Sequence, residues 1–71
     1  MRNWLKKLRE ERAETQEDVA RKLGITFQSY SYIENGKRRG DLNLSLMIKI
    51  SELFGLTLEQ IAELEKEKAS G

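Results

Sequence analysis

Residues 15–36 read TQEDVARKLGITFQSYSYIENG and contain two short helical segments that meet at a glycine. Thr15 is followed three residues later by Asp18, a spacing typical of the capping box that begins a helix. Gly24 is suited to the left-handed backbone conformation that ends a helix. Because a second helix starts at Thr26, the turn holds only about three or four residues, which predicts a helix-turn-helix. The inward face of the first helix is expected to hold Val19, Ala20 and Leu23.

The second helix of this pair, about residues 27–34, has two different sides. Tyr30 and Ile33 form its apolar side, and Asn35 with Gly36 ends it, because both residue types tolerate left-handed backbone angles. A separate stripe carries no charge and consists of Phe27, Gln28, Ser31 and Tyr32.

Three further helices are predicted around this pair. Trp4, Leu5 and Leu8 recur at helical spacing near the start of the chain. Asn43 is expected to cap a helix that ends at Gly55. That helix is apolar nearly all round, which predicts either the central helix of the core or part of an interface. Its apolar residues are Leu44, Leu46, Met47, Ile48, Ile50, Leu53 and Phe54.

The last helix opens with a second capping box, formed by Thr57 and Gln60. Its apolar stripe consists of Leu58, Ile61, Ala62 and Leu64, while residues 65–68 are expected to be solvated. The sequence thus predicts an all-α, compact five-helix bundle with one domain over residues 1–68 and a disordered tail over residues 69–71.

The amino-acid composition argues against several classes of function. The chain of 71 residues has no cysteine and no histidine, so it lacks disulfides, the usual zinc ligands and the usual general base. We therefore expect no enzyme activity, no metal, no cofactor and no small-molecule ligand. No apolar run approaches the roughly 20 residues that span a bilayer, which predicts a cytoplasmic protein without a membrane partner.

Charge is distributed unevenly along the chain. Residues 1–40 carry a formal charge of +4 and residues 41–71 a charge of −3, although the whole chain is only +1. This asymmetry indicates a polyanionic partner for the first part, although alternating charges also simply solvate helix faces.

Three stretches, TQEDVARKLGIT, SYIENGK and KISELFGLTLEQI, resemble the phage repressor and Cro family of helix-turn-helix regulators, often called the XRE family. The resemblance covers nearly the whole chain. It implies a lambda-repressor-like DNA-binding domain, whose second helix braces the third across the backbone of double-stranded DNA while the third reads the major groove. It also implies an internal salt bridge between Arg9 and Glu34.

Specific contacts follow from that resemblance together with the residue chemistry. Base readout is assigned to Phe27, Gln28, Ser31 and Tyr32, among which Gln28 suits adenine and Phe27 a thymine methyl group. Phe27 also suits a hydrophobic staple packed on Ile25. Phosphate contacts are assigned to Gln16, Thr26, Asn35, Lys37, Arg38 and Arg39.

The resemblance further implies a homodimer on a palindromic operator, with repression as the outcome, in the nucleoid of a prokaryotic or phage-encoded system. The interface is predicted to contain Leu56, Leu58, Ile61 and Leu64, although these residues also suit the core of a single subunit. Glu14, where an apolar residue is common, and the longer loop before Asn43 depart from the family pattern. An alternative is a helical protein-interaction module, antitoxin-like or adaptor-like, that does not bind DNA; RNA binding is a weaker third choice.

Overall fold

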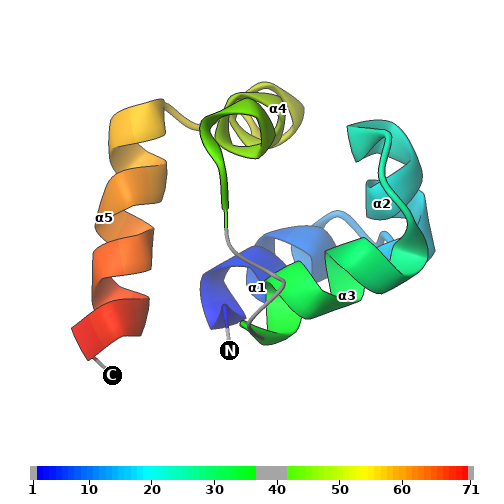
Figure 1. The fold of residues 1–71 in the computed structure, drawn as a ribbon, viewed down its shortest axis with the longest axis horizontal. Helices are drawn as coiled ribbons and strands as arrows, with labels where there is room; N and C mark the ends of the chain where they lie inside the picture. The colour runs from blue at the N-terminus through cyan, green and yellow to red at the C-terminus, as the bar shows by residue number, and fades with distance from the viewer. Residues whose placement is uncertain (1, 37–41, 71) are drawn as a thin grey trace.

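The computed structural model describes residues 2–36 and 42–70, with side chains as far as Lys66. Within these residues there are five α-helices and no strand: α1 (Asn3–Glu11), α2 (Gln16–Leu23), α3 (Phe27–Asn35), α4 (Leu44–Phe54) and α5 (Leu58–Ser70). Figure 1 shows α1, α2 and α3 together on one side, with α4 and α5 on the other. Because α2 also packs on α4, the two groups form a compact body of 28 × 25 × 22 Å. The predicted all-α, five-helix fold is confirmed.

The helices begin and end where local chemistry places them. Thr15 and Asp18 form the predicted reciprocal capping box, in which the Thr15 hydroxyl accepts the amide of Asp18 at 3.1 Å. Asn43 caps α4 by accepting the amide of Leu46 at 2.8 Å. These bonds satisfy amides that have no acceptor inside the first turn of a helix.

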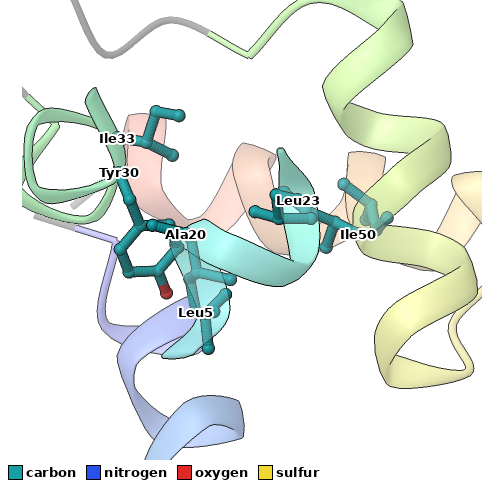
Figure 2. Close-up of a cluster of buried hydrophobic side chains, with 8 residues drawn as sticks. Leu5, Ala20, Leu23, Tyr30, Ile33 and Ile50 are labelled. Carbon is teal, nitrogen blue, oxygen red and sulfur yellow. The ribbon is translucent and has the colours of Figure 1, made fainter. Parts of the chain in front are cut away.

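The hydrophobic core lies where α1, α2 and α3 meet α4 and α5. Tyr30 and Leu5 are the largest completely buried apolar side chains, and Ile50 reaches the same cluster from α4 (Figure 2). Two charged residues, Arg2 and Glu34, are only 2% and 1% exposed. The buried apolar residues are Leu5, Val19, Ala20, Leu23, Tyr30, Ile33, Ile50 and Ile61.

Helix α4 is not the central helix of the core, as one sequence interpretation had it. Ile50 is its one fully buried residue, whereas Leu44 is 65% and Ile48 is 41% exposed. The helix lies on the outside of the bundle, so only one of its faces packs inward through side chains that are partly buried. The alternative, that α4 takes part in an interface, stays a prediction for its exposed residues.

No helix in the described residues is long and apolar enough to cross a membrane. Helix α5 runs to Ser70, and the predicted boundary between the domain and a tail after residue 68 stays a prediction.

Candidate nucleic-acid interface

The corner between α2 and α3 fixes how the two helices meet. Gly24 adopts a φ of +72°, and the amide of Ile25 donates to the carbonyl of Ala20 at 3.0 Å. Ala20 is 2% exposed, and its small side chain lets α2 and α3 pack closely. Thr26 then starts α3 by accepting the amide of Ser29 at 3.1 Å. As a result α3 lies with one side on the core and the other side in solvent.

The outer side of α3 carries the four residues predicted to read bases. Phe27 is 50% exposed, which does not fit a staple buried on the protein. Gln28 donates through Nε2 to the Tyr32 hydroxyl at 3.0 Å, and Asn35 donates through Nδ2 to the Ser31 hydroxyl at 3.2 Å. Both bonds join residues four apart, so they hold the polar groups on one uncharged face.

Glu34 lies in the last turn of α3, is almost completely buried and is the centre of a hydrogen-bond cluster. Its carboxylate accepts two bonds from Arg9, from Nε and Nη2, each at 3.0 Å. It accepts a third bond from Nε2 of Gln16 at 3.1 Å. Burial alone would raise the pKa of Glu34, but hydrogen bonds led by those from Arg9 lower the pKa below its usual value. The structure thus brings the predicted Arg9 and Glu34 pair together as a nearly buried ion pair.

The residues predicted to contact phosphates lie at the edges of this face. Gln16 is the first residue of α2 and is half-buried against Glu34, while Asn35 is the last residue of α3. The hydroxyl of Thr26 is exposed but already engaged with Ser29. Lys37, Arg38 and Arg39 lie outside the described residues. Among the described side chains, no cluster of acidic residues is arranged to hold a metal ion.

Comparison with known proteins identifies the family. A family model described as helix-turn-helix matches residues 5–65, which is most of the chain. The chain belongs to the helix-turn-helix family. The resemblance to XRE-type regulators is thereby confirmed.

Named relatives of this helix-turn-helix protein include two HTH-type transcriptional regulators and a control protein. It is 44% identical over 61 residues to an uncharacterised HTH-type transcriptional regulator of Methanocaldococcus jannaschii, covering 86% of the chain and 89% of the relative. It is 42% identical over 67 residues to control protein C.MunI of a Mycoplasma species, covering 92% and 88%. It is 46% identical over 55 residues to the uncharacterised HTH-type transcriptional regulator YqaF of Bacillus subtilis, covering 78% and 70%. No solved structure gives a significant match.

One residue assigned to the dimer interface of the helix-turn-helix protein is misplaced. Ile61 is completely buried in the core of the single subunit, because the inner side of α5 packs onto α4. It therefore has no exposed surface for a second chain. Leu58 is 40% exposed, while Leu56 and Leu64 are half-buried along a shallow groove at the start of α5.

A buried charge cluster at the N-terminus was missed in the sequence. The Arg2 guanidinium donates to the carboxylate of Glu65 at 2.7 and 3.2 Å and also to the carbonyl of Ile33. Trp4 donates through Nε1 to the same carboxylate at 3.0 Å. Glu65 was expected to be solvated, and that expectation is wrong. The partners are up to 63 residues apart, so no local spacing in the sequence predicts their contact.

Glu14, the departure from the family pattern, is held by charge instead of by apolar packing. Its carboxylate accepts from Arg12 and from Lys22, each at 2.9 Å. The hydrogen bond from Lys22 lowers the pKa of Glu14 most strongly. The acidic side chain is thereby accommodated at the junction of α1 and α2.

Proposed function

We propose that this chain is a transcriptional repressor that binds a palindromic operator in double-stranded DNA as a homodimer. Helix α3 enters the major groove, and Phe27, Gln28, Ser31 and Tyr32 contact the bases. Gln16 and Asn35 contact phosphates at the two edges of the groove, and Thr26, Lys37, Arg38 and Arg39 are proposed as further phosphate contacts. The proposal includes no catalytic activity.

The observation that carries this proposal is the composition of the exposed face of α3. It presents one amide, two hydroxyls and two aromatic rings, but no charged side chain, between the amide side chains of Gln16 and Asn35. Uncharged donors and acceptors discriminate base edges, whereas phosphate contacts supply affinity without sequence information. A protein partner has no comparable need for donors at both edges of the face.

The test compares two glutamines that undergo the same substitution. Operators are first selected from random duplex DNA, and each single-base variant of the selected site then competes for binding. Gln28→Ala should relax the preference at one base pair by about 1–3 kcal/mol and leave the ranking at other positions intact. Gln16→Ala should lower the affinity for all sequences by a similar factor.

Each variant serves as the control for the other, provided that circular dichroism shows both to be folded. If neither variant changes any base preference, α3 does not read bases through Gln28. Failure of the wild type to select any DNA would favour the adaptor-like interaction module instead.

We further propose that the dimer forms through the start of α5, around Leu56, Leu58 and Leu64. Leu58→Lys should convert a dimer into a monomer in sedimentation equilibrium, because it places a charge on an exposed apolar side chain. Leu44→Lys adds the same charge to an exposed leucine of α4 and should leave the dimer intact. The opposite pattern would place the interface on α4.

A further inference from the structure

We propose that Glu34 is a positioning residue for DNA binding, which fixes the side-chain amide of Gln16 so that a donor faces the phosphate. This inference rests on the proposed function, since it needs Gln16 to contact the DNA backbone. It goes further by assigning a role in binding to a carboxylate that is 1% exposed and touches no DNA itself.

The carboxylate determines which way the amide of Gln16 points. A carboxylate only accepts hydrogen bonds, so it bonds the NH₂ end of the amide and not the carbonyl end. The NH₂ group has two hydrogens, and Glu34 takes one of them. The second remains for an acceptor outside, such as a phosphate oxygen. A rotated amide would instead present a carbonyl oxygen to the phosphate, and two acceptors repel each other.

Arg9 makes this arrangement compatible with a polyanion. A lone carboxylate beside the DNA backbone would repel phosphates, but Arg9 forms a bidentate ion pair with Glu34 and offsets its charge. Arg9 is itself anchored by a bond from Nη1 to the carbonyl of Glu14 at 2.9 Å. The carboxylate therefore orients Gln16 without adding a net negative charge to the interface.

Gln16 is also held in a favourable place by its own helix. It is the first residue of α2, and Thr15 caps the amide of Asp18 in the same turn. The positive end of the helix dipole lies at this turn and attracts anions. The phosphate, the helix terminus and the oriented amide then meet at one point.

Glu34→Gln tests the orientation of the Gln16 amide, because glutamine has nearly the size of glutamate but different hydrogen-bonding groups. Three donors converge on the two oxygens of Glu34, namely two from Arg9 and one from Gln16. A glutamine at position 34 has one oxygen and one NH₂ group, so it cannot accept all three bonds. With its oxygen on Arg9, it presents a donor to Gln16 and favours the rotated amide.

The experiment is a cycle of four proteins: wild type, Glu34→Gln, Gln16→Ala and the double variant. Each is titrated with selected and unselected duplex DNA at a temperature where thermal melts show all four to be folded. Glu34→Gln should weaken binding to every sequence by about fivefold, the typical effect of one hydrogen bond. In the Gln16→Ala background the same substitution should have almost no effect.

The outcomes separate this inference from the proposed function. If Gln16→Ala weakens binding but Glu34→Gln has the same effect in both backgrounds, or none, Glu34 does not act through Gln16 and the inference is overturned. If no protein in the cycle binds DNA, the proposed function itself fails. Arg9→Met is a further control, because it removes the ion pair but leaves an acceptor for Gln16. An effect of Arg9→Met that persists in the Gln16→Ala background measures what the ion pair contributes by routes other than Gln16, namely the structure and the neutralisation of the Glu34 charge.

A measurement on the wild type alone keeps the inference testable if Glu34→Gln does not fold. In NMR spectra without DNA, the two Nε2 protons of Gln16 should have widely separated shifts and slow exchange with solvent, because one of them is bonded to the almost completely buried carboxylate of Glu34. Gln60 supplies the comparison, because it is exposed and only its Oε1 is engaged, as the acceptor of the Thr57 amide. Gln16 protons with the shifts and exchange rates of a free glutamine would overturn the orientation by Glu34.

Discussion

Tyr30 places a hydroxyl group in the core, where its environment has a measurable consequence. The side chain is completely buried, and no described residue meets the hydroxyl in hydrogen-bond geometry. Burial raises the pKa of the phenol, and the nearby carboxylate of Glu34 raises it further. The ring therefore contributes packing, while the hydroxyl remains unsatisfied.

Tyr30→Phe should consequently leave the free energy of unfolding unchanged or raise it by up to about 1 kcal/mol. A buried hydroxyl without a partner costs about 1–3 kcal/mol, and phenylalanine keeps the ring. Urea denaturation monitored through Trp4 fluorescence measures the difference. A loss above about 2 kcal/mol would show that the hydroxyl bonds Glu34 in solution.

Glu34 gives the stability of the fold a defined dependence on pH. Its pKa is lower in the folded protein than its usual value, so the ionised form is stabilised by folding. This contribution is complete above the unfolded pKa of about 4.3 and is lost as the pH falls through the folded pKa.

Below pH 4.3 the difference in unfolding free energy between wild type and Glu34→Gln should therefore shrink. Chemical denaturation at a series of pH values tests this. Glu63→Gln changes an exposed position and should follow the wild-type profile. A difference that stays constant from neutral pH to pH 3 would contradict the ion pair.

At the scale of the elements, the sequence predicted where the helices begin and end, but not which side of the apolar helices is buried. Capping depends on residues three or four apart, so Thr15 and Asn43 are recognisable from local spacing alone. Which face of α4 or α5 is covered depends on partners distant in the chain. Ile61 and Leu58 are therefore indistinguishable in an apolar stripe, although the structure buries one and exposes the other.

Substitutions in two turns between helices should change the free energy of unfolding in opposite directions. Ala13 has a φ of +55° and Gly24 a φ of +72°, both in the left-handed region that disfavours side chains. Ala13→Gly should raise the unfolding free energy by up to about 1 kcal/mol. Gly24→Ala should lower it by about 1 kcal/mol, from backbone conformation alone, because a Cβ there meets no atom within 4 Å. Thermal melts that shift in the same direction for both variants would contradict this conformational explanation.

At the scale of the whole molecule, three separate parts of the chain are tied together at Arg2. Its backbone amide donates to the carbonyl of Glu34 at 2.8 Å, and its side chain reaches Ile33 at the end of α3 and Glu65 in α5. Helix α3, proposed to read the bases, and helix α5, proposed to form the dimer, are thereby linked through the N-terminus. Sequence reasoning could find the helix pair but not this link, since it exists only after the ends of the chain have met.

A double-mutant cycle should detect this link as a coupling energy. Arg2→Met and Glu65→Gln are each expected to lower the free energy of unfolding by about 1–3 kcal/mol, less than the ~3–5 kcal/mol of a fully buried pair. The reduction follows from Glu65, whose side chain is 25% exposed while that of Arg2 is 3% exposed. Each single substitution removes the ion pair, so the double variant should lose less stability than the sum of the two single losses.

Glu63 and Lys66, an exposed pair at 3.9 Å, provide the control and should show coupling below about 0.5 kcal/mol. Additive losses for Arg2 and Glu65 would mean that the two residues stabilise the fold independently, and the ion pair would then not link α5 to the end of α3.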